Sequence, residues 1–90
     1  MKRLLVKIRG LVQGVGFRYF AYKKAMLLGV KGYVVNLPDG SVLVDCEGDE
    51  KILSLFLDYL KKGPPYARVD GLEVVEKEPV YYESFEIKRY

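Results

Sequence analysis

The sequence predicts an α+β fold, a two-layer sandwich in which two helices cover one face of an antiparallel sheet. Two segments carry apolar residues at the spacing of an amphipathic helix. The segments around them are short, rich in β-branched residues and bounded by glycine or proline, as strands joined by turns are. The chain has 90 residues, of which half are apolar and 30% are charged. That is enough for one core, and we expect a single domain over residues 1–90.

The chain opens with a strand and then forms its first helix. Residues 2–9 alternate, which predicts a half-buried strand with Leu4, Val6 and Ile8 on one face. A glycine-rich loop follows. The first helix is predicted over residues 16–28 and ends at Gly29, because glycine readily takes the left-handed conformation found at helix ends.

The next two strands are predicted to form a hairpin. Residues 30–36 and 41–47 are both rich in valine, and the sequence Leu-Pro-Asp-Gly at 37–40 is typical of a tight turn. Cys46 alternates with two valines on the face expected to be buried. It is the only cysteine, so we expect a buried thiol and no internal disulfide.

A second amphipathic helix follows the hairpin. Acidic residues at 49 and 50 suit its start, lysines at 61 and 62 suit its last turn, and Gly63 ends it. Residues 67–76 are predicted as a fourth strand with an irregularity at Gly71. Residues 84–90 alternate again, with Phe85 and Ile87 inward, and form either a fifth strand or the return of the fourth. The order βαββαβ is that of the ferredoxin-like two-layer sandwich.

The loop between the first strand and the first helix is suited to an anion. Residues 10–18, GLVQGVGFR, contain three glycines, which let the backbone turn tightly and approach a ligand. The N–H groups of such a loop and of the helix start attract negative charge. Arg18 adds a planar cation matched to a phosphate. We therefore predict a phosphoryl-binding loop made of Gln13, Gly14, Val15, Gly16, Phe17 and Arg18.

The topology brings a second polar residue to the same edge of the sheet. A right-handed crossover makes the first two strands parallel, so both end at one edge. With the third strand between them, their axes lie about 10 Å apart. Arg18 follows the first strand and Asn36 ends the second. The two side chains are therefore expected to reach a common ligand.

At this point the sequence resembles the acylphosphatase family over essentially its full length. Residues 10–18 match the family's first signature, G-x-V-Q-G-V-x-F-R, at every fixed position. Residues 32–36, GYVVN, with Gly40, Val42 and Gly48, resemble the second. The chain has Val35 where the family commonly has a basic or polar residue, and Leu37 where threonine is common.

The resemblance implies hydrolysis of the carboxyl–phosphate bond of small acylphosphates. It assigns phosphate binding to Arg18 and orientation of the attacking water to Asn36. A carboxylate leaves readily, so the reaction needs positioning and charge stabilisation more than a strong acid or base. Because asparagine is a poor base, we infer that the substrate's own phosphate takes the water proton. We expect no cofactor and no metal.

The composition indicates which kinds of partner and which cellular location to expect. The net charge is +3 and the pI about 9.0, which favours anionic substrates, but the basic residues are scattered and do not predict a nucleic-acid surface. No apolar run approaches the ~20 residues of a membrane span. We expect a cytoplasmic monomer. The scarcity of amides, one Asn and one Gln, is typical of heat-adapted proteins.

Three other functions use the same fold or motifs. They are a module that binds single-stranded RNA on its sheet, a non-catalytic anion-binding regulatory domain, and a domain of a carbamoyl-transferring maturation factor. The Gln13 side chain either contacts the ligand or only stiffens the loop. The acidic run Asp45, Glu47, Asp49 and Glu50 lacks the calcium-loop spacing and is expected to be a solvated strand end and helix start.

Overall fold

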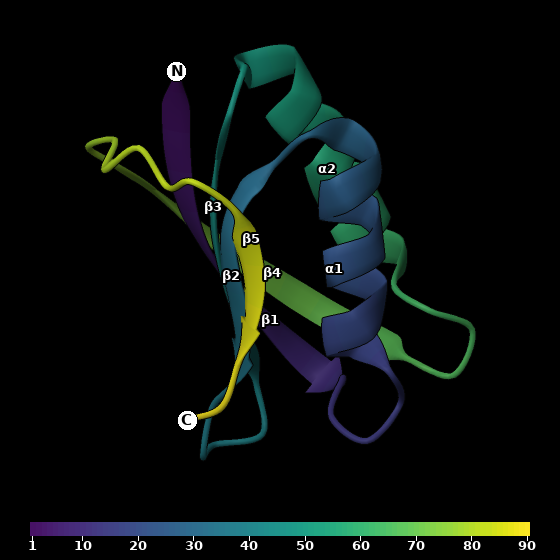
Figure 1. The fold of residues 1–90 in the computed structure, drawn as a ribbon. Helices are drawn as coiled ribbons and strands as arrows, with labels where there is room; N and C mark the ends of the chain where they lie inside the picture. The colour runs from purple at the N-terminus through teal and green to yellow at the C-terminus, as the bar shows by residue number, and fades with distance from the viewer.

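The computed structural model describes all 90 residues as one five-stranded sheet with two helices packed on one of its faces (Figure 1). The sheet order is β4-β1-β3-β2-β5. In chain order the elements are β1 Lys2–Leu11, α1 Phe17–Leu28, β2 Lys31–Asn36, β3 Val42–Gly48, α2 Glu50–Lys62, β4 Arg68–Lys77 and β5 Phe85–Lys88. The α+β ferredoxin-like arrangement is confirmed, and β3 lies between β1 and β2, the arrangement on which the estimate of about 10 Å depended.

The last strand makes the sheet mixed. β1, β2, β3 and β4 pair antiparallel, as predicted, but β5 pairs parallel with β2, from Gly32 opposite Phe85 to Val35 opposite Lys88. The C-terminal segment is therefore a fifth strand and not the return of the fourth. The chain leaves β4 at one edge of the sheet and crosses to the opposite edge through residues 78–84 (Figure 1).

The core lies between the helices and the sheet. α1 packs on β2 and β5, and α2 packs on β1, β3 and β4. The predicted inward residues of β1 are buried, as is Cys46. Burial raises the pKa of the Cys46 thiol to about 12. Ile87 is an exception to the predicted inward pattern of β5, because 42% of it is exposed, whereas Phe85 is buried. Neither helix is long and apolar enough to cross a membrane.

The irregularity expected near Gly71 is present as a shift in register. Arg9 pairs with Gly71, whereas the next residue, Gly10, pairs with Val69. Gly10 has a φ of 130°, and a Cβ atom there would lie 2.1 Å from the carbonyl oxygen of Arg68. Only glycine allows the two backbones to approach this closely.

The face of the sheet away from the helices carries two buried carboxylates. Asp45 and Glu47 are each 1% exposed, so the expected solvated strand end is wrong for these two residues. Asp45 accepts two hydrogen bonds from the Arg3 guanidinium, at 2.9 and 2.7 Å, and one from the Tyr82 hydroxyl at 2.8 Å. The segment that links β4 to β5 lies against both carboxylates and removes them from water.

Candidate active site

The loop before α1 presents unpaired backbone donors. Gly14 and Gly16 have left-handed φ angles of 76° and 80°, which glycine adopts without a steric penalty. Gly16 caps α1, no side chain bonds to this helix end, and the first bond to the cap runs from Phe20 N–H to the Gly16 carbonyl at 3.0 Å. The N–H groups of residues 14–16 donate no hydrogen bond within the chain. With the free N–H groups of the first helical turn they form a site for an anion.

Asn36 is the last residue of β2, where the strand leaves the sheet. Its backbone is fixed by pairing with Val42. Its side-chain oxygen, Oδ1, is buried and has no hydrogen-bond partner. A buried polar atom without a partner costs free energy. An unpartnered oxygen at the end of this strand therefore indicates a ligand or water that completes the bond.

The loop and Asn36 line one pocket. Its volume is about 260 Å³, and its walls come from the loop, the first turn of α1 and the ends of β2 and β5. The lining residues are Val12, Gly14, Gly16, Phe17, Arg18, Tyr19, Asn36, Ile87 and Arg89. The predicted residues Gly14, Gly16, Phe17, Arg18 and Asn36 thus meet at one place, although Arg18 and Asn36 lie on different elements.

Two members of the predicted loop do not line this pocket. The Gln13 side chain turns away and donates from Nε2 to the carbonyl oxygens of Leu37 and Ser41, both at 2.8 Å. It ties the loop to the turn between β2 and β3, so of its two possible roles the structure shows the stiffening one. Val15 packs partly buried against the core.

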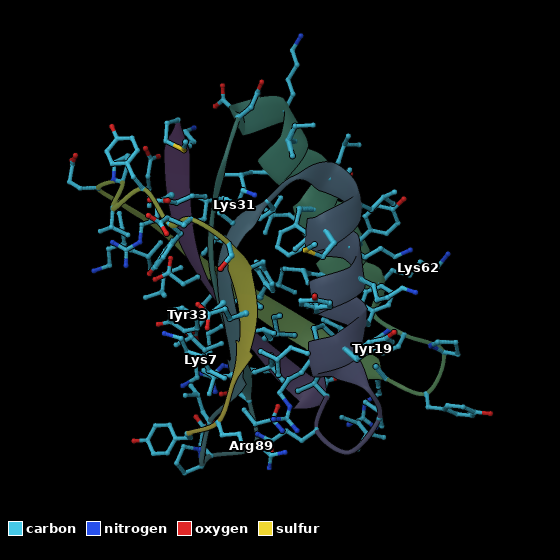
Figure 2. All side chains as sticks on the ribbon, in the orientation of Figure 1. Lys7, Tyr19, Lys31, Tyr33, Lys62 and Arg89 are labelled. Atoms are coloured by element: carbon cyan, nitrogen blue, oxygen red, sulfur yellow. The ribbon has the colours of Figure 1, made fainter.

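Four pocket residues were missed by the sequence analysis, namely Val12, Tyr19, Ile87 and Arg89. Figure 2 shows Arg89 at the end of β5, at the same end of the molecule as the loop that precedes α1. The signal was present in part, since residues 85, 87 and 89 share one face of a strand. The missing information was the place of β5 beside β2, which brings that face to the pocket.

The charge of the pocket is positive and uncompensated. Arg18 and Arg89 are its only charged lining residues, and neither makes an ion pair or a side-chain hydrogen bond. No carboxylate, histidine or cysteine lines it. Nowhere in the chain do three or more such side chains gather at a spacing that could hold a metal ion.

Comparison with known proteins finds relatives that match nearly the whole length of the chain. The family model described as acylphosphatase matches residues 4–87. An acylphosphatase of Thermotoga petrophila is 53% identical over 90 residues, the full length of both chains. The crystal structure of acylphosphatase from Bacillus subtilis superposes with a TM-score of 0.96 at 35% identity, covering 98% of this chain and 99% of that one. Full-length HypF, in its phosphate- and nucleotide-bound form, gives a TM-score of 0.90 at 34% identity; the match covers 97% of this chain and 12% of HypF.

Proposed function

This chain belongs to the acylphosphatase family, and we propose that it hydrolyses the carboxyl–phosphate bond of acylphosphates with Arg18 and Asn36 as its catalytic residues. The products are a carboxylate and inorganic phosphate. The observation that carries this assignment is the meeting, in one pocket, of an unpaired guanidinium, a loop of free N–H groups and a buried amide oxygen without a partner.

The phosphoryl group binds at the start of α1. The N–H groups of residues 14–16 and of the first helical turn point at its oxygens, and the Arg18 guanidinium donates to two of them. The backbone donors among them are fixed by the loop and the helix before the substrate arrives. They therefore stabilise the charge on the phosphoryl oxygens in the transition state without reorganisation.

Asn36 orients the attacking water. The water donates one hydrogen to the unpartnered Oδ1, which directs an oxygen lone pair at phosphorus. As the new P–O bond forms, the bond from phosphorus to the acyl oxygen breaks, and its electron pair leaves with the carboxylate. The second water proton passes to a phosphoryl oxygen, since no carboxylate or imidazole lines the pocket.

The leaving group needs no acid from the protein. A carboxylate is stable at neutral pH, so the acyl oxygen departs unprotonated. A phosphate monoester would release an alkoxide or phenoxide, which is a poorer leaving group. The pocket offers it no carboxylic acid or imidazole that could protonate it. This difference defines the substrate class as acylphosphates and not phosphate monoesters.

A hydrolysis assay tests the proposal directly. Benzoyl phosphate is the generic acylphosphate, and p-nitrophenyl phosphate is the monoester control. We expect rapid release of inorganic phosphate from the first and little from the second. Binding of inorganic phosphate without any turnover of benzoyl phosphate would overturn the proposal in favour of a regulatory anion-binding domain.

We further infer that the enzyme works as a cytoplasmic monomer and does not bind nucleic acid. The lone cysteine is buried and unpaired, as is usual in a reducing compartment. Three of the five arginines are held in ion pairs with neighbouring carboxylates, which leaves fewer free cations for a phosphate backbone. Salt-dependent binding of single-stranded RNA together with absent hydrolysis would contradict this inference.

A further inference from the structure

We propose that Ile87 and Arg89 form the acyl side of the pocket, and that Arg89 selects acylphosphates whose acyl group ends in a second anionic group, a carboxylate or a phosphate. The inference rests on the proposed function, because it concerns the substrate of the same pocket. It begins from β5, which the sequence analysis could not place.

The position of β5 brings both side chains to the pocket. β5 runs parallel to β2, with Val34 opposite Ile87 and Val35 opposite Lys88. Phe85 anchors the strand, since it is 4% exposed and packs edge-on against Phe56. Alternate residues of a strand share a face, so Ile87 faces the same side of the sheet as Phe85, and Arg89 follows directly after the strand ends at Lys88. Both of these residues, Ile87 and Arg89, line the pocket.

The five arginines of the chain fall into two groups, those that contact a carboxylate and those that do not. Arg3, Arg9 and Arg68 each contact a carboxylate, of Asp45, Glu73 and Asp70 respectively. The two arginines in the pocket, Arg18 and Arg89, contact none. Two like charges that share a pocket without a counter-ion raise the energy of the empty protein. Such a pair is suited to a ligand that brings two negative groups.

One of these guanidiniums already suffices for the phosphoryl group. The loop N–H groups and Arg18 together offer more donors than three phosphoryl oxygens need. Arg89 comes from the strand side of the pocket and not from the loop, so it is available to another part of the substrate. The acyl group is the only other part of an acylphosphate.

Apolar surface lies beside the second guanidinium. Ile87 is 42% exposed and Tyr19 is 60% exposed, and both line the pocket. Exposed apolar side chains contribute binding energy when a ligand covers them. A short carbon chain lying on Ile87, with an anionic end at Arg89, matches this arrangement.

The test compares three acylphosphates that differ at the far end of the acyl chain. They are succinyl phosphate with a terminal carboxylate, 3-phosphonopropanoyl phosphate with a terminal phosphonate, and butanoyl phosphate with a methyl group. We expect wild-type kcat/KM to be higher for the two anionic substrates. The variant Arg89→Gln should reduce the anionic-to-neutral ratio of kcat/KM by roughly tenfold, as loss of a charge-assisted hydrogen bond implies. Arg89→Lys should restore part of the ratio.

Lys88→Gln is the matched control. It removes one positive charge from the adjacent residue, whose ammonium lies over the Tyr33 ring, 4.5 Å from its centroid and outside the pocket. The ratio should stay at the wild-type value in this variant. A ratio that falls equally in both variants would overturn the proposal, because general charge steering would then explain the preference.

Two further outcomes would also overturn it. One is a wild-type enzyme that hydrolyses all three substrates with equal kcat/KM. The other is an Arg89→Gln variant in which kcat/KM falls equally for all three substrates and inhibition by inorganic phosphate weakens, since Arg89 would then contact the phosphoryl group. Each of these outcomes leaves the proposed hydrolysis intact. If the wild-type enzyme hydrolysed none of the three substrates, the proposed function would instead be refuted.

Discussion

The buried carboxylate of Glu47 accepts a hydrogen bond from the backbone N–H of Tyr82, at 2.7 Å, on the face of the sheet away from the helices. The same carboxylate accepts from the N–H groups of Val80 and Tyr81. Three consecutive backbone donors thus converge on one side chain. This contact fixes the segment that leads into β5. β5 contains Ile87 and is followed directly by Arg89, and both residues line the pocket.

Replacing Glu47 with glutamine should destabilise the fold. Glutamine keeps the shape but removes the charge and turns one of the two acceptor oxygens into a donor that faces backbone N–H groups. We expect a loss of about 2–3 kcal/mol in the free energy of unfolding. Urea denaturation measures it, and Glu86→Gln, an exposed glutamate on β5, is the control. Equal stability of the two variants would show that Glu47 does not hold the segment.

The free energy of unfolding should also fall at acid pH, because Glu47 becomes protonated. Burial raises the pKa of Glu47, but the backbone donors of Tyr82, Val80 and Tyr81, with the charge of Arg3, outweigh burial and leave this pKa below its ordinary value. A carboxyl whose pKa is lower in the folded state stabilises the fold above its unfolded pKa of about 4.3. This contribution is lost as the pH falls through the folded pKa.

Urea titrations of the wild type and Glu47→Gln at a series of pH values between 7 and 3 test this sign. The wild type should lose its advantage over the variant as the solution becomes more acidic, so that the two stabilities converge. A constant difference across the series would mean that another group carries the acid sensitivity.

The convergence of Arg18 and Asn36 could be predicted from the sequence, whereas the position of β5 could not. A right-handed crossover follows from chain chirality and holds for any sequence of this element order. No such rule places a short edge strand. β5 pairs with β2, and the segment before it is fixed by backbone N–H groups that bond to Glu47. Backbone donors leave no residue-type signal in the sequence.

The burial of Asp45 and Glu47 escaped prediction for a related reason. Acidic residues on the outer face of a strand usually face water. The partners that allow Asp45 to be buried, Arg3 and Tyr82, lie 42 and 37 residues away in the chain. An alternating pattern reports which face a residue is on, but not which distant segment covers that face.

Substitution of Arg18 should abolish both phosphate binding and turnover. Arg18→Ala removes the only side-chain cation of the loop, and we expect kcat/KM to fall at least about a hundredfold. Arg18→Lys should recover little, because an ammonium cannot donate two parallel hydrogen bonds to a phosphoryl group. Benzoyl phosphate hydrolysis and inhibition by inorganic phosphate are the measurements. Arg68→Ala, which removes an exposed arginine paired with Asp70 outside the pocket, should behave as the wild type does.

Chelation should leave the activity unchanged. The residues that line the pocket supply backbone N–H groups, guanidiniums and one amide, and none of the carboxylates, imidazoles or thiolates that hold catalytic metals. Hydrolysis of benzoyl phosphate after treatment with EDTA, followed by gel filtration, should therefore match that of the untreated enzyme. Loss of activity that one divalent cation restores would contradict the mechanism.

Substitution of Asn36 should separate catalysis from binding and from stability. Asn36→Ala removes the buried oxygen that has no partner in the protein, so the attacking water loses its acceptor, and kcat should fall about a hundredfold or more. The phosphoryl donors are untouched, so inhibition by inorganic phosphate should persist. Removing an unpartnered buried acceptor costs the fold nothing in hydrogen bonding, so urea stability should stay equal or rise. A variant that keeps the wild-type kcat would exclude Asn36 from orienting the water. One that loses kcat and stability together would make Asn36 a structural residue.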